Sequence, residues 1–184
     1  MKLAAILNAL GLILVALGAI MLTPIGVALL TREYASVLPF VVACMVSVGL
    51  GLLFRWRGGF SRDFDELKRS EGMLIVSLAW VVAGGIGGIP YLFYELGPVD
   101  AYFESISGFT TTGATILKDF APYPKTFFFW RSLSQWLGGM GIIVLFVAIL
   151  PQFAVAGRQM FFAEAPGPTE EKVTPRITQT AKAL

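Results

Sequence analysis

The chain has 184 residues, of which 56% are hydrophobic and only 14% are charged, and its mean hydropathy is +0.74. Soluble domains carry a charged fraction of roughly 25%, so this composition excludes an ordinary soluble domain and indicates a membrane protein. The net charge is +2. The absence of histidine excludes histidine-based metal sites and histidine general bases. The single cysteine excludes an intrachain disulfide.

Four stretches are long and apolar enough to cross a hydrocarbon core of about 30 Å, which takes about 20 helical residues. We expect these spans at Leu3 to Leu30, Ala35 to Phe54, Gly72 to Tyr94 and Thr126 to Leu150. The first apolar run is too long for a cleaved signal peptide, so we interpret it as a retained helix. Pro24 removes an intrahelical hydrogen bond and is expected to kink this helix near its outer end.

Clusters of lysine and arginine mark the cytoplasmic loops of membrane proteins. The loop after the second span contains Arg55, Arg57, Arg62, Lys68 and Arg69. The tail beyond Pro151 contains Arg158, Lys172, Arg176 and Lys182. If the spans alternate in direction, both termini are cytoplasmic and the segments 31–36 and 95–125 lie outside.

The third span contains four closely spaced glycines, Gly84, Gly85, Gly87 and Gly88. Small residues let helices approach closely in lipid, so we interpret these glycines as a packing surface. A hinge in the helix is the alternative interpretation. Gly138, Gly139 and Gly141 in the fourth span are interpreted in the same way.

The outer segment between the third and fourth spans is too apolar for an ordinary loop. A short helix is expected to follow Pro98, with Asp100 as its cap, and to stop at Gly108 after about ten residues. The polar run TTTGAT, residues 110–115, follows it, and two prolines then return the chain to the outer face. The pattern predicts a re-entrant hairpin: a helix too short to span, a polar turn and a return.

Non-helical backbone at membrane depth is tolerated only where it is buried in protein or lines a water-filled cavity. Extended backbone from Thr110 to Ala114 would present carbonyl oxygens to a passing cation. Gly113 supplies the positive φ that turns a carbonyl toward an axis, and the threonine hydroxyls support that geometry or bind the ion themselves. The C-terminus of the short helix adds partial negative charge. A threonine-rich turn without ion binding is the alternative for these residues alone; the flanking helix and spans favour a filter.

Several sequence blocks occur in the order seen in one transporter superfamily. They are FESISGFTTTGATIL, FFFWRSLSQWLGGMGIIVLFVAILP, AEAPGP and PRITQTAKAL. Together they resemble the Trk/Ktr/HKT potassium transporters, and most closely the TrkH-type membrane subunit. The resemblance implies an all-α polytopic membrane protein with four transmembrane helices, one re-entrant pore helix and a filter loop. It implies K⁺ as the transported ion, bound by the carbonyls of Thr111, Thr112 and Gly113, and no covalently bound cofactor.

The resemblance also implies an organisation along the chain. Residues 1–71 would be an N-terminal transmembrane hairpin with its cytoplasmic loop, and residues 154–184 a cytoplasmic linker. Residues 72–153 would form one repeat, with the outer helix at 72–94, the pore helix at 98–108, the filter at 109–115 and the inner helix at 126–150. The superfamily has four such repeats around one pathway, and this chain matches only the first.

One repeat cannot enclose a pore, so the chain is either a fragment, which we favour, or a unit that assembles in several copies. A non-conducting membrane interaction module is the alternative function. A membrane enzyme is disfavoured, because the acids are scattered and no nucleophile has a base beside it. The expected partners are the lipid bilayer, the remaining repeats or copies of the chain, and a cytoplasmic nucleotide-binding regulator, with no nucleic acid. The expected location is the bacterial inner membrane, and channel or symporter behaviour is left open.

Three polar residues are candidates for support of the filter. Glu104 lies in the short helix, where an acid needs hydration or a partner. Arg131 either snorkels to the interface or pairs with Glu104 or Asp100. Gln135 is placed by helical spacing to form hydrogen bonds behind the filter.

Overall fold

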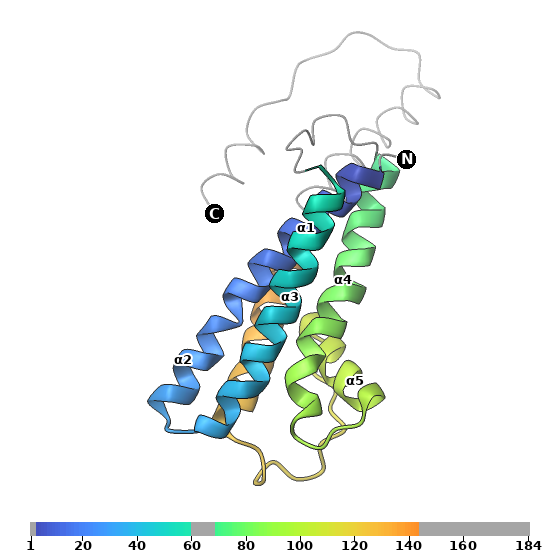
Figure 1. Cartoon of the computed structure of the whole chain (residues 1–184). Helices are drawn as coiled ribbons and strands as arrows, with labels where there is room; N and C mark the ends of the chain where they lie inside the picture. Colours follow the sequence, from blue (N-terminus) through green and yellow to red (C-terminus); the bar gives the residue numbers. More distant parts are fainter. Residues whose placement is uncertain (1–2, 60–68, 144–184) are drawn as a thin grey trace, which may run out of the picture. The chain divides into compact units, whose positions relative to one another are not determined.

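Residues 3–59 and 69–143 are described by the computed structural model, and every regular element within them is helical (Figure 1). The elements are α1 (Leu3–Ile20), α2 (Leu22–Leu30), the 3₁₀ turn η1 (Tyr34–Ser36), α3 (Val37–Arg57), α4 (Arg69–Leu92) and α5 (Pro98–Phe109). A further helix begins at residue 125 and is described to residue 143; we call it the C-terminal helix. Residues Met1–Gly138 form one compact unit, to which the following description is confined. The predicted all-α class is confirmed for this part of the chain.

Three helical stretches have the length and hydropathy of membrane spans among the described residues. They are Leu3–Leu30, Tyr34–Arg57 and Ser70–Leu92, which agree with the first three predicted spans. The fourth predicted span starts as expected, in the C-terminal helix, but its last residues, 144–150, lie outside the described part. The basic residues Arg62 and Lys68 and the tail 154–184 lie outside it as well.

The first span is broken at Met21, between α1 and α2. Pro24 has no N–H to donate to the carbonyl of Ile20 four residues earlier. The hydroxyl of Thr23 donates to that carbonyl instead, at 2.8 Å. The predicted kink is therefore confirmed, and the polar group that proline frees is satisfied by its neighbour.

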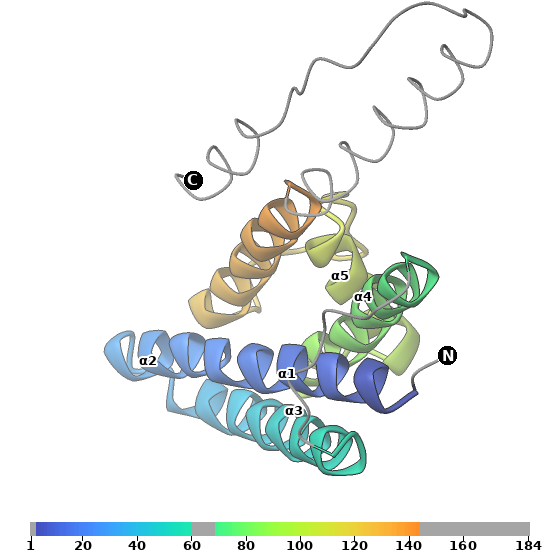
Figure 2. The same ribbon diagram turned by 90° about the horizontal axis from the view of Figure 1, so that it is seen from above.

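Small residues bring α1 and α3 together, side by side in Figure 2. A Cβ at Gly51 would lie 2.8 Å from the carbonyl oxygen of Gly11, so the two backbones are in direct contact. Next to this contact the Ser47 hydroxyl donates to the Leu14 carbonyl at 2.7 Å, and the Cys44 thiol lies 3.2 Å from the Gly18 carbonyl. Close packing of this kind holds membrane helices together, because lipid offers no hydrophobic driving force between them.

Three of the four glycines of α4 form the surface on which α5 packs. Gly84 lies against the side chain of Ile106, Gly87 against Phe109, and a Cβ at Gly88 would meet the Ala101 carbonyl oxygen at 3.0 Å. Gly85 points away, and a Cβ added there would have no atom within 4 Å. The packing interpretation is confirmed for the three that face α5, and α4 continues through all four without a break.

Aromatic side chains fill the space between these helices and the start of the C-terminal helix. Trp130 is fully buried, and its ring meets Phe40 of α3 and Phe109 of α5 edge-on, with centroid distances of 6.0 and 6.1 Å. Its indole N–H donates to the carbonyl of Gly87 in α4 at 2.9 Å. Buried tryptophan usually finds such a partner. One residue thus connects three helices behind the end of α5.

Candidate functional site

Helix α5 has 12 residues and is therefore about 18 Å long, too short to cross about 30 Å of hydrocarbon. Pro98 occupies its first position, so the cap position falls on Gly97, which has no side chain. The predicted cap at Asp100 is wrong for this reason. Asp100 lies in the first turn, where its carboxylate still faces the positive end of the helix dipole.

The helix passes Gly108 and ends one residue later, so the predicted stop at Gly108 is also wrong. The amide of Thr112 donates to the Ser107 carbonyl at 3.1 Å, and that of Thr111 to the Gly108 carbonyl at 2.9 Å. These two bonds form a Schellman ending, whose left-handed residue is usually glycine. Here it is Thr111, with φ of 57°. The left-handed conformation costs about 1 to 2 kcal/mol for a residue with a Cβ, so the turn is strained.

The segment after α5 begins with a turn at residues 110–111, which corrects the prediction of extended backbone from Thr110 onward. Gly113 has φ of 75°, so the predicted positive φ is confirmed. No atom lies within 4 Å of where its Cβ would be. The backbone conformation, and not crowding, accounts for glycine at this position.

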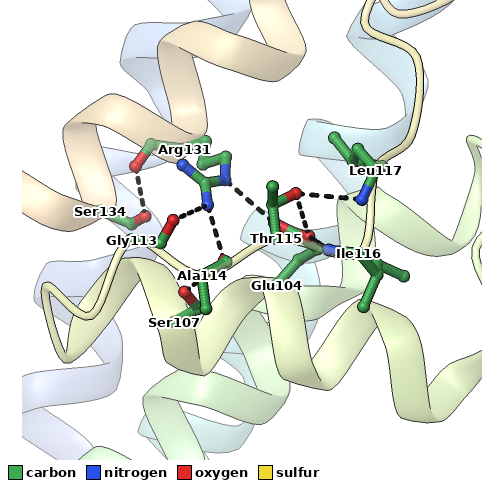
Figure 3. A network of polar contacts seen from close by, with 9 residues as sticks. All are labelled: Glu104, Ser107, Gly113, Ala114, Thr115, Ile116, Leu117, Arg131 and Ser134. Carbon is green, nitrogen blue, oxygen red and sulfur yellow. Dashed lines mark hydrogen bonds and ion pairs between the residues drawn. The ribbon is translucent and has the colours of Figure 1, made fainter.

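The carbonyl of Ala114 belongs to the polar network shown in Figure 3. It accepts a hydrogen bond from the Ser107 hydroxyl at 2.5 Å and another from Nη2 of Arg131 at 2.9 Å. Both of its lone pairs are therefore used. Ala114 was expected among the ion-binding residues; its carbonyl is engaged by Ser107 and Arg131, and its role toward an ion stays a prediction.

Glu104 is the centre of the network and is fully buried. Its carboxylate accepts hydrogen bonds from the Thr115 hydroxyl at 2.5 Å and from the Ile116 amide at 2.7 Å. The predicted pairing with Arg131 is present: Nε lies 2.9 Å from the other carboxylate oxygen. The alternatives for Arg131, snorkelling and pairing with Asp100, are not adopted. Glu104 thus connects α5 to the chain that leaves the turn and to the C-terminal helix.

Arg131 completes the connection from the C-terminal helix to the turn. Its Nη2 donates to the carbonyl of Ala114 and lies 3.4 Å from that of Gly113, while its Nε is bound to Glu104. A guanidinium offers several donors in one plane, which suits this simultaneous contact with a carboxylate and two carbonyls. The side chain is 16% exposed, so the charge pair is largely shielded from solvent.

Other residues of the C-terminal helix pack directly on the end of α5. The Ser134 hydroxyl donates to the Arg131 carbonyl at 2.8 Å and stands where a Cβ of Gly108 would be. Gly138 has the backbone carbonyl of Phe109 in the place of a Cβ, so its predicted packing role is confirmed. Gln135 is half-buried and makes no hydrogen bond to residues 109–117, all of which are described. Ser134 and Gly138 make contacts behind the end of α5, and the support role of Gln135 stays a prediction.

Oxygen atoms crowd the exposed side of the turn. In the described structure no hydrogen bond is donated to the carbonyls of Thr110, Thr111 or Thr112, and residues 110–113 are exposed. The hydroxyls of Thr110 and Thr112 lie 2.8 Å apart, and Thr110 also donates to the Ile106 carbonyl at 2.7 Å. These carbonyl and hydroxyl oxygens are uncharged, and neutral oxygen ligands suit the binding of a hard monovalent cation.

Sequence reasoning missed a contact at the opposite end of the C-terminal helix. The carboxylate of Glu33, in the turn before α3, accepts hydrogen bonds from the amides of Lys125 and Thr126, each at 3.0 Å, and from the Thr126 hydroxyl at 2.6 Å. Burial raises the pKa of Glu33, but the hydrogen bonds from Thr126 and Lys125 outweigh it, so the pKa is lowered below 4.5. The partners are more than 90 residues apart, and no local pattern links them.

Comparison with known proteins gives consistent results. The family model TrkH, described as a cation transport protein, matches residues 40–184. The Trk system potassium uptake protein TrkH of Vibrio parahaemolyticus is 44% identical over all of this chain, which corresponds to 38% of that protein. TrkG of Escherichia coli K12 is 32% identical over 89% of the chain and 34% of its own length. The crystal structure of the potassium transporter TrkH from V. parahaemolyticus superposes with a TM-score of 0.79 at 40% identity, covering the whole chain and 36% of that structure.

Proposed function

The chain belongs to the TrkH family of cation transport proteins, and from this premise we propose that it supplies one ion-filter repeat for potassium uptake. It is a multi-pass membrane protein. Its relatives are named potassium uptake proteins, which supports K⁺ as the ion. The observation that carries the proposal is the exposed, oxygen-rich turn at residues 110–113, held from behind by a buried ion pair.

In the proposed mechanism a K⁺ ion exchanges its hydration oxygens for backbone carbonyls. The ligands are the carbonyls of Thr111, Thr112 and Gly113. The carbonyl of Gly113 has only a long contact of 3.4 Å with Arg131, which leaves a lone pair for the ion. Selectivity over Na⁺ then depends on the number and field strength of the carbonyls and on the size of the site. The ion moves inward down its electrochemical gradient, and no covalent chemistry is needed.

The Glu104–Arg131 pair has two roles in this proposal. It fixes the backbone that follows the filter carbonyls, through the Ile116 amide and the Ala114 carbonyl. The pair also reduces the repulsion between Arg131 and a cation in the pathway, because the Glu104 carboxylate balances the guanidinium charge at 2.9 Å. Loss of the acid alone would leave a positive charge facing the ion.

A complete pathway requires more than this chain's single filter segment. The chain spans about 38% of the length of the curated relatives it matches. We propose that further repeats, or further copies of the chain, surround the same axis. Within this proposal residues 1–71 are the N-terminal hairpin and its loop, 72–153 the repeat, and 154–184 a linker on the cytoplasmic side, where a nucleotide-binding regulator would dock. Both termini are then cytoplasmic in a bacterial inner membrane.

Rubidium tracer uptake tests the proposal in potassium-uptake-deficient cells that express the chain. The Gly113→Ser variant forces a side chain onto a backbone with φ of 75° and should reduce uptake and selectivity over Na⁺. Gly26→Ser is the matched control, because a side chain at Gly26 meets no atom within 4 Å and lies in α2, away from the turn. Unchanged transport by Gly113→Ser would reject the filter role. No uptake by any variant, with membrane expression confirmed, would reject self-assembly and favour a non-conducting module or a dependence on other repeats.

A further inference from the structure

The turn between α2 and α3 holds Glu33 in one position. Arg32 adopts a left-handed φ of 61°, and the Glu33 amide donates to the Ala28 carbonyl at 2.8 Å. The Ser36 amide in turn donates to the carbonyl of Glu33 at 2.9 Å. Both polar groups of the Glu33 backbone are therefore bound within the turn, and its side chain extends from a fixed base.

The C-terminal helix begins without a cap of its own. The residue before it is Pro124, whose side chain has no hydrogen-bond acceptor, although the first N–H groups of a helix need partners. Glu33 provides the missing acceptors from another part of the chain, with both carboxylate oxygens in use. Its negative charge also lies at the positive end of the helix dipole. Thr126, which it binds twice, is fully buried.

The same helix carries the contacts that hold the turn at residues 110–113. Arg131 follows Thr126 by five residues, or about 7.5 Å along the axis, and Ser134 and Gly138 follow on the next turns. A helix behaves as a rigid rod over this distance, so a shift or rotation at its start moves the guanidinium by a similar amount. The contacts at risk are short: 2.9 Å from Arg131 to the Ala114 carbonyl and 2.9 Å to Glu104.

We propose that Glu33 is a positioning residue for the ion filter: it sets the start and rotation of the C-terminal helix and thereby holds Arg131 against the filter carbonyls. This inference rests on the proposed function of the turn. It makes the N-terminal hairpin a part of the filter's support.

The first test compares Rb⁺ over Na⁺ selectivity of uptake for three variants. Glu33→Ala removes all three bonds and should lower selectivity about threefold to tenfold, the change in a two-state population expected from loss of a helix cap. Glu33→Gln keeps one acceptor oxygen and should have an intermediate effect. Glu95→Gln is the matched control, because it removes the same charge from an exposed acid that the described structure leaves without a hydrogen bond. Pro124→Asp in the Glu33→Ala background supplies a local cap and should restore selectivity.

The outcomes separate this inference from the proposed function. If Gly113→Ser alters selectivity while Glu33→Ala equals the Glu95→Gln control, the inference fails and the filter stands. If neither variant alters selectivity, the filter itself fails. If the chain alone takes up no rubidium, hydrogen exchange of the purified chain decides: Glu33→Ala should speed exchange at the amides of Lys125 and Thr126 and also at that of Ile116. Faster exchange confined to the helix start would overturn the inference.

Discussion

Substitution of Gly87 by alanine tests whether α5 depends on close contact with α4. A Cβ at Gly87 would lie 2.5 Å from Cε2 of Phe109 and 2.7 Å from the hydroxyl oxygen of Ser105. Carbon atoms in contact prefer about 3.5 to 4.0 Å, so the two helices must separate by about 1 Å. The ring of Phe109 is buried and packs against Trp130, which blocks its movement toward that side. Overpacking of this kind typically destabilises a protein by about 1 to 3 kcal/mol.

The Gly85→Ala variant is a matched control in the same helix with the opposite expected sign. Nothing lies within 4 Å of a Cβ at Gly85, and alanine is favoured over glycine inside a helix by about 0.5 to 1 kcal/mol. Thermal unfolding of the purified chain in a mild detergent measures both. At about 2 to 4 °C per kcal/mol for a chain of this size, we expect Gly87→Ala to lower Tm by about 2 to 12 °C. Gly85→Ala should leave Tm unchanged or raise it. A Tm for Gly87→Ala equal to that of the Gly85→Ala variant would refute the packing argument.

Three further outcomes follow from the site. Glu104→Ala leaves Arg131 buried without its partner and should destabilise the chain by about 3 to 5 kcal/mol in thermal unfolding. The double variant Glu104→Ala, Arg131→Leu should recover part of this stability, and equal losses in the single and double variants would contradict the pairing. Thr111→Gly relieves the left-handed strain and should leave Tm unchanged or higher while lowering Rb⁺ over Na⁺ selectivity, and a lower Tm would show that the strain is not present. Folding lowers the pKa of Glu33 from its ordinary value of 4.5. The stabilisation that Glu33 gives the folded chain is therefore fully present above pH 4.5 and is lost as the pH falls through the lower, folded-state pKa. The difference in Tm between the wild type and Glu33→Ala should be constant from about pH 5.5 to 8, within the precision of the melt, and should shrink only in stronger acid.

Features with a local cause could be predicted from the sequence. Apolar runs of sufficient length predicted the spans, Pro24 predicted the break at Met21, and Gly113 predicted a positive φ, because in each case one residue type carries the physical property. The Glu104–Arg131 pair was one of several options, since burial makes a partner necessary but does not name it. Its presence was predictable, and its geometry was not.

Features that depend on contacts distant in sequence were missed. Threonine in the left-handed position at residue 111 contradicts local preference and persists only because the surrounding bonds hold it. The direction of the Ala114 carbonyl is set by Ser107 and Arg131, which no pattern in TTTGAT reveals. Glu33 was passed over as part of a short polar turn, since its partner is more than 90 residues away.

The separation of Glu33 from Thr126 has a consequence for the order of assembly. Glu104 and Ile116 are 12 positions apart and Glu33 and Thr126 are 93, and closing the longer loop costs about 2 kcal/mol more in chain entropy. At a synthesis rate of about 5 to 20 residues per second, Thr126 is synthesised roughly 5 to 20 s after Glu33. During this time Glu33 has only partners within its own turn, such as Thr31. Of the hydrogen bonds that hold the C-terminal helix in this unit, those of Glu33 close the longest loop of chain.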